Sequence, residues 1–595
     1  MLDGERVRLR KEDRASLSPG DPPAWGSDVI AEALCATGVT HIALTPGSSF
    51  RGLHDSLVNH LGSRRPEILL CLHEEHCVAI AHGYAKVTGE PMAVALHSNV
   101  GLMHASMALY NAYCDRVPML VVGATGPVDA ARRRPWIDWI HTSADQAMIV
   151  RPYLKWDDQP ASVDASAASV LQANRITRTH PPAPVYVCLD VSVQEEPLTT
   201  AGELPPVSRF APIPDAVPDP ADVARAATLL SGAARPVVLL GRVGRGTTEW
   251  ARRVRLVERL GARVITDAKL PSAFPTDHPQ HGAPPAVFLG AANLELLRGA
   301  DVVLALDWCD LAGTLRSAGA AHSTVISASV DHHVHNGWTK DSYGPAPVDL
   351  ALPCRADIAV AALLATLGPD DEPATAPAEG TPGGDVPEPA GSGNVITVPV
   401  LQRALYQATL GTQPCLIRTP ISWDGRYWPL RGPLDALGHD GGAGLGSGPG
   451  MAVGAALALR GSARLPVAVL GDGDLLMGAT ALWTASKHNI PLLVVVANNA
   501  SFYNDEVHQR TIAATRGRPL DNASIGVALD EPSADLATLA GSLGFTGLGL
   551  VTARADLPTM LARAVQVVQA GGRALVDVRV EPGYTAETTE ALTHD

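Results

Sequence analysis

The sequence lacks the features of a membrane protein, a secreted protein or a nucleic-acid-binding protein. No apolar run reaches the ~18 consecutive residues that a membrane-spanning helix needs. The charged segment 1–24 has no apolar core of the kind that a secretory signal contains, so export is not expected. A formal charge of -15 leaves no excess of Lys and Arg for nucleic acid or an anionic membrane, and we expect neither as a partner.

Cysteine is sparse and scattered. The 8 cysteines include no CxxC pair, and their spacing supports neither a zinc site nor a dense disulfide framework. Reduced thiols of this kind are typical of the cytoplasm. Together these absences favour a cytoplasmic protein that acts on small molecules.

The most regular feature present is an alternation of short Val-, Ile- and Leu-rich runs with longer helical patterns. This alternation is typical of βα units wound into parallel sheets. Stretches crowded with Pro, Gly and acidic residues interrupt it at 194–220 and 368–394, and we interpret both as linkers. The sequence therefore predicts an α/β fold with three doubly wound parallel-sheet domains. The expected segments are a flexible N-terminal extension at 1–24, domains at 25–193, 221–367 and 395–585, and a tail at 586–595.

Polar side chains follow two predicted strands of the third domain. The strand at 465–470 runs into Gly471–Asp474, and after a helix to about Asn489 the strand at 491–497 ends at Asn498–Asn499. Parallel strands deliver such side chains to one edge of a sheet, where α/β folds bind ligands. Asp and Asn oxygens suit Mg²⁺, and the glycines allow backbone N–H groups to approach a phosphate. The alternative is a plain surface turn, because Asp-Gly and Asn-Asn are ordinary turn formers.

The GDG motif, a 24-residue interval and the NN pair resemble the signature of thiamine diphosphate (ThDP) enzymes. The segment "ALWTASKHNIP" is similar to the intervening helix of benzoylformate decarboxylases. The resemblance implies that Asp472, Asn499 and the backbone carbonyl of Ser501 bind Mg²⁺, while Asp474 caps the following helix or borders the diphosphate. The segment 442–458 resembles the glycine-rich part of the family that wedges an apolar side chain between the two cofactor rings. Residues expected at the cofactor in this domain are Gly444, Leu445, Gly471, Asp472, Gly473, Asp474, Asn499, Ser501 and Phe502.

A second motif, "HEEHCVAIAHGYA", lies in the first domain where an apolar strand runs into a helix. Two glutamates at a helix N-terminus can simply complement the helix dipole. The order HE, eight residues and GYA resembles instead the ThDP-family segment whose glutamate hydrogen-bonds N1' of the aminopyrimidine ring, and its register selects Glu74 over Glu75. A carboxyl group can exchange the proton that activates the cofactor, whereas an amide cannot.

Ser48 and His97 follow two further predicted strands. Taken alone, they are a turn serine and a core histidine. Their loops resemble benzoylformate decarboxylase and its relatives, where a serine and a histidine at these positions contact the substrate and move protons. The sequence departs from the family at His104, where relatives usually have Asn, and at 502–504, where they usually have an aromatic residue followed by Gly.

The middle domain carries glycines at 235–246 in a GxxGxG spacing, which is not the dinucleotide fingerprint. The resemblance implies a Rossmann-like domain that binds FAD, ADP or nothing, and this spacing gives no support to FAD.

The motifs extend over about 27–585, and they resemble those of the acetolactate synthase, benzoylformate decarboxylase and pyruvate oxidase-like ThDP enzymes. The resemblance implies decarboxylation of a 2-oxo acid, or carboligation of the resulting acyl group to a second carbonyl compound such as an aldehyde. Alternatives are a hydrolase or aldehyde lyase that works without decarboxylation, and a non-catalytic paralogue that binds ThDP or FAD. Relatives build the site between subunits, so a homodimer is the minimum expected and a homotetramer is favoured.

Overall fold

The computed structural model describes residues 22–62, 65–199, 204–333, 346–368, 386–389, 393–439 and 441–593. The chain divides into two compact units, Met1–Pro214 and Asp215–Asp595. The strands of the described residues form three parallel sheets, one in the first unit and two in the second. This arrangement confirms the predicted α/β fold. Most of the extension predicted at 1–24 and of the linker predicted at 368–394 lies outside the described residues.

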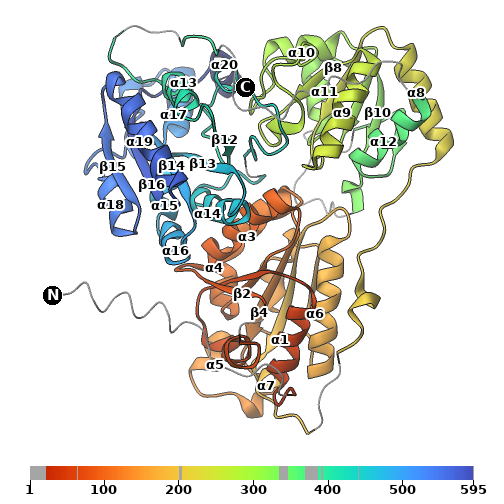
Figure 1. Ribbon diagram of the computed structural model, residues 1–595, viewed down its shortest axis with the longest axis vertical. Coiled ribbons are helices and arrows are strands. Elements are labelled where there is room, and N and C mark those ends of the chain that lie inside the picture. Colours follow the sequence, from red (N-terminus) through yellow and green to blue (C-terminus); the bar gives the residue numbers. More distant parts are fainter. Residues whose placement is uncertain are drawn as a thin grey trace. The chain divides into compact units, whose positions relative to one another are not determined.

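The first unit contains a parallel sheet with strand order β2-β1-β3-β4-β6-β5. Figure 1 labels β2 and β4 of this sheet. β2 and β3 pair with opposite edges of β1, so the winding direction of the chain reverses there. Ligands of α/β folds bind beyond the carboxyl ends of the strands at such a point. The strands are β1 His41–Leu44, β2 Glu67–Leu70, β3 Ala93–Leu96, β4 Met119–Thr125, β5 Trp156–Asp158 and β6 Pro184–Asp190. The helices are α1 Gly26–Ala36, α2 Arg51–Asp55, α3 Glu74–Thr88, α4 Ser98–Cys114, α5 Ile137–His141, α6 Val163–Arg178 and α7 Val191–Gln194.

Side chains on the two faces of the buried strands pack against two different layers of helices in this unit. Ile42 and Leu44 of β1 share one core with Ile30 of α1 and Val170 of α6. Helices α3 and α4 pack on each other and on other strand residues. α3 ends at Gly89, whose φ of 70° is the left-handed conformation that glycine adopts readily at a helix C-terminus.

The second unit begins with a central domain whose parallel sheet has the order β11-β10-β9-β7-β8 (Figure 1). Its strands are β7 Pro236–Leu240, β8 Arg263–Thr266, β9 Val302–Leu306, β10 Thr324–Ala328 and β11 Leu350–Leu352. Its helices are α8 Pro220–Gly232, α9 Thr247–Leu260, α10 Ala291–Arg298, α11 Leu311–Ala318 and α12 Ala356–Leu367.

The C-terminal domain of this unit has a parallel sheet of order β12-β13-β14-β16-β15. Its strands are β12 Gln413–Leu416, β13 Arg464–Gly471, β14 Leu492–Asn498, β15 Thr546–Val551 and β16 Arg573–Arg579. Its helices are α13 Val398–Ala408, α14 Gly448–Leu459, α15 Asp472–Gly478, α16 Ala481–Lys487, α17 Tyr503–Thr515, α18 Leu536–Ser542, α19 Leu557–Gln569 and α20 Ala586–Thr593.

Two segments of this domain differ from their sequence-based description. The helix expected after Asp474, to about Asn489, begins already at Asp472 and is divided into α15 and α16. Gly478 at the end of α15 lies so close to the carbonyl of Gly446 that a Cβ would approach it to 2.1 Å. The segment named as a tail forms α20, in which Thr588 is buried.

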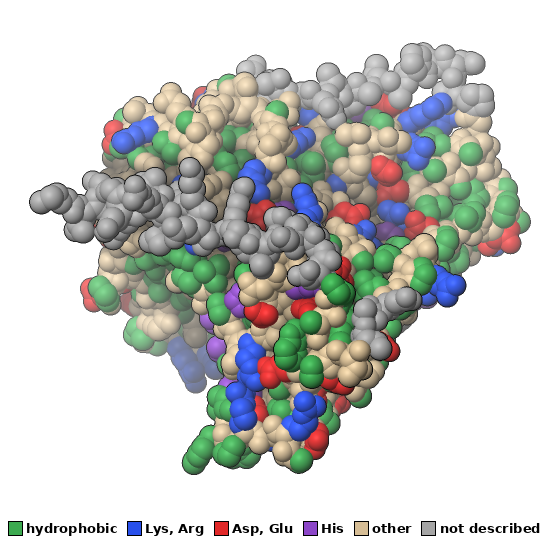
Figure 2. Space-filling view, turned by 60° about the horizontal axis from the view of Figure 1, so that its bottom comes forward, with side chains coloured by type: hydrophobic (Ala, Val, Ile, Leu, Met, Phe, Trp, Pro, Cys, Tyr) green, Lys and Arg blue, Asp and Glu red, His purple; other side chains and the backbone are tan. Residues whose placement is uncertain are grey.

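None of the helices in the described parts of the chain combines the length and apolar character needed to cross a bilayer. On the face shown in Figure 2, Lys and Arg side chains lie among Asp and Glu side chains.

Candidate active site

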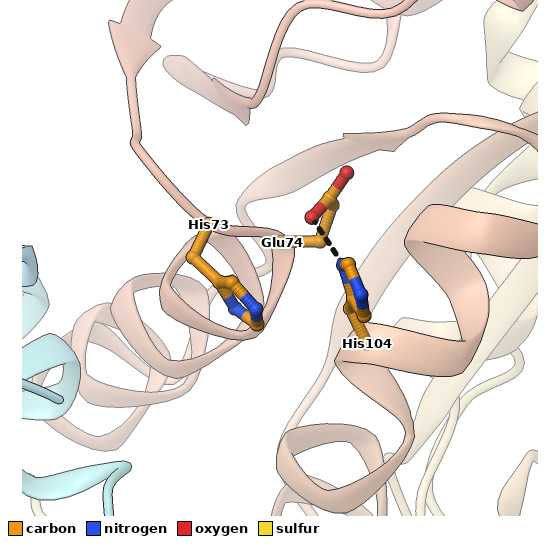
Figure 3. A group of neighbouring side chains, drawn as sticks. All are labelled: His73, Glu74 and His104. Carbon is orange, nitrogen blue, oxygen red and sulfur yellow. Dashed lines mark hydrogen bonds and ion pairs between the residues drawn. The ribbon is translucent and has the colours of Figure 1, made fainter. Parts of the chain in front are cut away.

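Glu74 opens helix α3 at the carboxyl end of β2 (Figure 3). The side chain of His73 caps this helix, because its Nδ1 accepts the backbone N–H of Glu75 at 3.2 Å. Glu74 is only 7% exposed, and its Oε2 accepts a hydrogen bond from Nδ1 of His104 on α4 at 3.0 Å. Glu74 is therefore in contact with a second functional group, the imidazole of His104.

Gly101 lets α4 approach the Glu74 carboxyl group. A Cβ at this position would lie 3.1 Å from Glu74 Cγ and 3.2 Å from Oε1, which is tighter than ordinary contact. Sequence reasoning missed Gly101, although its position three residues before His104 puts both on the same face of the helix.

His73, Glu74 and His104 each offer one ligand atom, and these atoms lie within 4.8 Å of one another. The two imidazole rings stack with centroids 4.7 Å apart and planes inclined by 22°. Lone pairs of imidazole nitrogens lie in the ring plane, so nearly parallel rings do not aim them at one ion. The group is arranged for hydrogen bonding rather than for metal ligation.

His97 follows β3, and its side chain contacts Ser49, a residue that sequence reasoning did not single out. Ser49 Oγ accepts the backbone N–H of Ser98 at 3.1 Å and lies 2.9 Å from Nδ1 of His97. A hydrogen bond therefore joins the Ser49 hydroxyl to Nδ1 of His97 and orients the imidazole ring. Burial lowers the pKa of His97, and the neighbouring His141 lowers it further, so the ring is neutral near pH 7.

Ser48 is exposed at the start of the short 3-10 helix Ser48–Phe50. Ser48 directly precedes Ser49 in the sequence. Its predicted contact with a substrate stays a prediction. A Cβ at Gly47 would lie 2.4 Å from Cβ of His97, so the loop after β1 passes close to this histidine.

His76 makes the stability of the protein sensitive to acid. It is 3% exposed, and burial, followed by the adjacent His73, lowers its pKa to about 4. In the unfolded chain His76 takes up a proton near its ordinary pKa of 6.5, whereas in the folded chain it does so only near pH 4. The free energy of unfolding is therefore not reduced by His76 above pH 6.5, and it declines as the pH falls toward 4. We expect a loss of about 3 kcal/mol across this window, which denaturant unfolding at pH 7 and pH 4.5 would measure.

His76→Leu should remove this part of the pH dependence, whereas His508→Leu, at an exposed histidine of α17, should leave it unchanged. Equal pH dependence in wild type and His76→Leu would contradict the assignment.

The second unit brings Asp472, Asn499 and Ser501 around a cavity of about 410 Å³. Asp472 begins α15 directly after β13, and Asn499 follows β14. The two strands are paired with Gly471 opposite Ala497, so their ends meet at one edge of the sheet. Asn499 Oδ1 accepts the backbone N–H of Ser501 at 3.0 Å, which fixes the turn of the chain after the strand.

Asp472 is a buried carboxylate suited to a cation. It is 5% exposed, and burial raises its pKa while backbone N–H groups of Gly473, Asp472 and Ala500 and the charge of Arg579 act in the opposite direction. A buried carboxylate beside a carboxamide, in a cavity large enough for a ligand, is a donor set that fits Mg²⁺. The described residues therefore fit the ion that the sequence motif implies.

Asp474 holds the glycine-rich loop rather than capping its own helix. Its Oδ1 accepts the backbone N–H of Gly446 at 2.7 Å and that of Gly448 at 3.4 Å, and Nε of Arg418 donates to Oδ2 at 2.9 Å. Asp474 and Arg418 are both almost completely buried. This ion pair fixes the loop that carries Leu445, and neither Arg418 nor this role was predicted from the sequence.

Other predicted residues of this domain lie at the same cavity. Leu445 is 43% exposed and lines it, as do Gly471 and Phe502. Gly473 is required by packing, because a Cβ there would lie 2.4 Å from the ring of Phe502. Gly444 accepts the hydroxyl of Ser447 through its carbonyl at 3.0 Å.

Two acidic side chains, Asp357 and Glu249, lie at the glycine-rich loop of the central domain. The backbone N–H of Gly244, which follows β7, donates to Asp357 Oδ2 at 2.6 Å. A Cβ at Gly246 would lie 2.0 Å from Oε2 of Glu249, at the start of α9. Two carboxylates therefore lie where a phosphate would have to approach the loop.

Comparison with protein families assigns each sheet to a known domain type. Residues 24–149 match the model described as thiamine pyrophosphate enzyme, N-terminal TPP binding domain. Residues 223–337 match the central domain of the same enzymes, and residues 420–578 match their C-terminal TPP binding domain.

Individual relatives are distant. The chain is 26% identical over 447 residues to benzoylformate decarboxylase from Pseudomonas aeruginosa, covering 73% of this chain and 79% of that protein. It is 24% identical over 566 residues to acetolactate synthase from Bacillus subtilis, covering 93% of each. The solved ThDP-dependent 4-hydroxybenzoylformate decarboxylase from Rhodococcus jostii RHA1 superposes with a TM-score of 0.75 at 22% identity, covering 94% of this chain and 100% of the other. This last similarity concerns the fold alone.

Proposed function

Because the chain belongs to the thiamine diphosphate-dependent enzyme family, we propose that it binds ThDP and Mg²⁺ and cleaves or forms a carbon–carbon bond next to a carbonyl group. The leading reaction is decarboxylation of a 2-oxo acid, alone or followed by acyloin-type carboligation. Support comes from relatives with 2-oxo acid decarboxylase and acetolactate synthase activities. The observation that carries the proposal is the contact of a buried glutamate, Glu74, with a hydrogen-bond donor at the position of the family's activating carboxylate.

The C-terminal domain would hold the diphosphate end of the cofactor. Asp472, Asn499 and the Ser501 carbonyl would bind Mg²⁺, and backbone N–H groups at the start of α15 would receive phosphate oxygens. Leu445 lines the same cavity and would pack against the cofactor rings. ThDP, when bound, supplies the carbon nucleophile and the electron sink that carbon–carbon cleavage requires.

The first unit would supply the proton chemistry. Glu74 would share a proton with the ring nitrogen N1' of the cofactor, which an ionisable carboxyl group can give up and take back. His97 would exchange protons with the substrate, because burial favours its neutral ring and Ser49 orients that ring. Burial of Glu74 excludes water that would otherwise compete for the carboxyl group.

Glu74 and Asp472 lie in different units, and we propose that each site combines Glu74 of one copy with Asp472 of another, in a homodimer or a larger homotetramer. Support comes from apolar side chains that are exposed on and around α4 in the single chain. They include Met103 (56%), Trp136 (81%), Trp139 (75%) and Met148 (68%). Exposed apolar surface of this kind marks protein interfaces.

Replacing both tryptophans, Trp136→Glu and Trp139→Glu, should reduce the particle mass from a multiple of 62.1 kDa to that of one chain. Multi-angle light scattering after size exclusion measures this mass. Val217→Glu is the matched control, because Val217 is also 81% exposed but lies in the segment before α8. An unchanged mass in the tryptophan variant would contradict the assignment of this surface.

The proposed reaction is tested by incubating the protein with ThDP and Mg²⁺ and a panel of 2-oxo acids, aldehydes and 1,2-diones, while CO₂ and products are followed. ThDP-dependent CO₂ release from a 2-oxo acid supports the leading reaction. Carbon–carbon cleavage without CO₂ would favour a hydrolase or an aldehyde lyase, and ThDP binding without turnover would favour a non-catalytic paralogue. Failure to bind ThDP would contradict the proposal as a whole.

The purified protein should show no flavin absorbance, given the carboxylates at the central glycine loop.

A further inference from the structure

His104 on α4 contacts both His73 and Glu74 at the start of α3 (Figure 3). The backbone N–H of Glu75 donates to Nδ1 of His73, which fixes the His73 ring. That ring stacks on the ring of His104, with centroids 4.7 Å apart. His104 Nδ1 then lies 3.0 Å from Glu74 Oε2. Each ring orientation is therefore constrained by the preceding contact, although His104 is itself half exposed.

The two carboxyl oxygens of Glu74 have different surroundings. Oε2 accepts the hydrogen bond from His104, while Oε1 lies against Gly101. Within the described residues, no hydrogen bond to Oε1 is found. A carboxyl group that is hydrogen-bonded at one oxygen only presents the other oxygen in a fixed orientation, and such fixation is what efficient proton transfer requires.

We propose that His104 is a positioning residue for Glu74, which rests on the proposed ThDP function. Its Nδ1–H donates to Oε2 and leaves Oε1 as the oxygen that shares a proton with the cofactor. No proton is transferred to or from His104 in this role. Burial lowers the pKa of His73, so this ring stays neutral and keeps its Nδ1 as the acceptor of the Glu75 N–H.

The length of the side chain decides which substitution preserves this hydrogen bond. In His, Nδ1 is two bonds from Cβ, and the amide nitrogen of Asn is also two bonds from Cβ, whereas that of Gln is three bonds away. His104→Asn therefore keeps a donor at the right distance and removes the ring. His104→Gln moves the donor, and His104→Leu removes it while keeping much of the volume.

The test measures two properties of the protein with ThDP and Mg²⁺ but without substrate. One is the dissociation constant of ThDP, and the other is the rate at which the C2 proton of bound ThDP exchanges for deuterium, followed by acid quench and NMR. In His104→Leu and His104→Gln the exchange rate should fall ~10–100-fold, the value of a hydrogen bond to a charged group. The dissociation constant should change less than ~3-fold, because the hydrogen bond of His104 is to Glu74 and the residues proposed to bind the diphosphate and Mg²⁺ belong to the other unit. His104→Asn should stay within ~3-fold of wild type in both.

A matched control is available in the same unit, where His60 Nε2 lies 2.9 Å from Glu32 Oε1. His60→Leu removes a histidine–glutamate pair away from Glu74 and should leave the exchange rate unchanged. In the Glu74→Gln background, adding His104→Leu should cause no further loss, since the two changes act through one interaction. In the cofactor-free protein, ¹⁵N signals of the His104 ring should report a proton on Nδ1, and Glu74→Leu should change them.

The inference is overturned if His104→Leu exchanges as fast as wild type, or if His104→Asn is as slow as His104→Leu. It is also overturned if His104→Leu weakens ThDP binding as much as it slows exchange. Wild-type protein that binds no ThDP would contradict the proposed function instead, so the two failures are distinguishable.

Discussion

Glu74→Gln is expected to slow exchange of the C2 proton of bound ThDP by ~10²–10⁴-fold, the usual contribution of a positioned acid–base group, and to abolish CO₂ release from 2-oxo acids. Glutamine has nearly the same shape and can still accept the hydrogen bond from His104, so packing against Gly101 is retained. It cannot give and take a proton near neutral pH. Because Glu74 and the Asp472 cavity belong to different units, ThDP and Mg²⁺ should still bind. Quenched exchange with NMR detection and calorimetric binding provide the two measurements.

Glu75→Gln is the matched control for this substitution. It makes the same chemical change one residue later, at a half-buried position whose side chain is outside the Glu74–His104 pair. Exchange at the wild-type rate in Glu74→Gln would contradict the role of Glu74. An equal loss in Glu75→Gln would indicate that the charge of the helix N-terminus, rather than one carboxyl group, is responsible.

The fold could be predicted from the sequence because parallel sheets leave a strong pattern. Strands such as Leu492–Asn498 are buried on both faces and appear as continuous Val- and Leu-rich runs, bounded by helices with a different period. The break between α15 and α16 could not be predicted in this way. At the end of α15, Gly478 lies against the carbonyl of Gly446, which is distant in sequence and leaves no trace in the local pattern.

The candidate site was predictable where its residues follow strands. Asp472 and Asn499 each come directly after an apolar run, and neighbouring parallel strands must bring such positions together. Contacts between side chains of different segments carry no comparable signal. The contact of Ser49 with His97, the salt bridge of Asp474 with Arg418, and the hydrogen bond of His104 to Glu74 depend on side-chain directions that spacing does not specify. His104 was visible in the sequence only as a departure from the family pattern.

Asp472→Asn is expected to weaken Mg²⁺-dependent ThDP binding by at least ~100-fold, since loss of even an outer partner of a metal ligand costs 10–100-fold. The same substitution should stabilise the cofactor-free protein at neutral pH. Burial raises the pKa of Asp472 above its unfolded value, so the ionised side chain opposes folding at any pH above both values, and an uncharged amide removes that penalty. Calorimetric titration with ThDP and Mg²⁺ and thermal unfolding without them would measure these opposite changes.

The predicted loss of ThDP binding together with a gain in stability distinguishes this result from misfolding, because a misfolded variant loses both stability and binding. Asp505→Asn is the control, since Asp505 lines the same cavity and loses the same charge but is exposed at the start of α17.

Mixing Asp472→Asn with Glu74→Gln adds a test of the assembly. If each site combines Glu74 of one copy with Asp472 of its partner, random dimers should recover ~25% of the wild-type sites, because half of the dimers are mixed and each mixed dimer has one intact site. If both residues act within one chain, the mixture should stay inactive, because every chain then carries one damaged half of its own site.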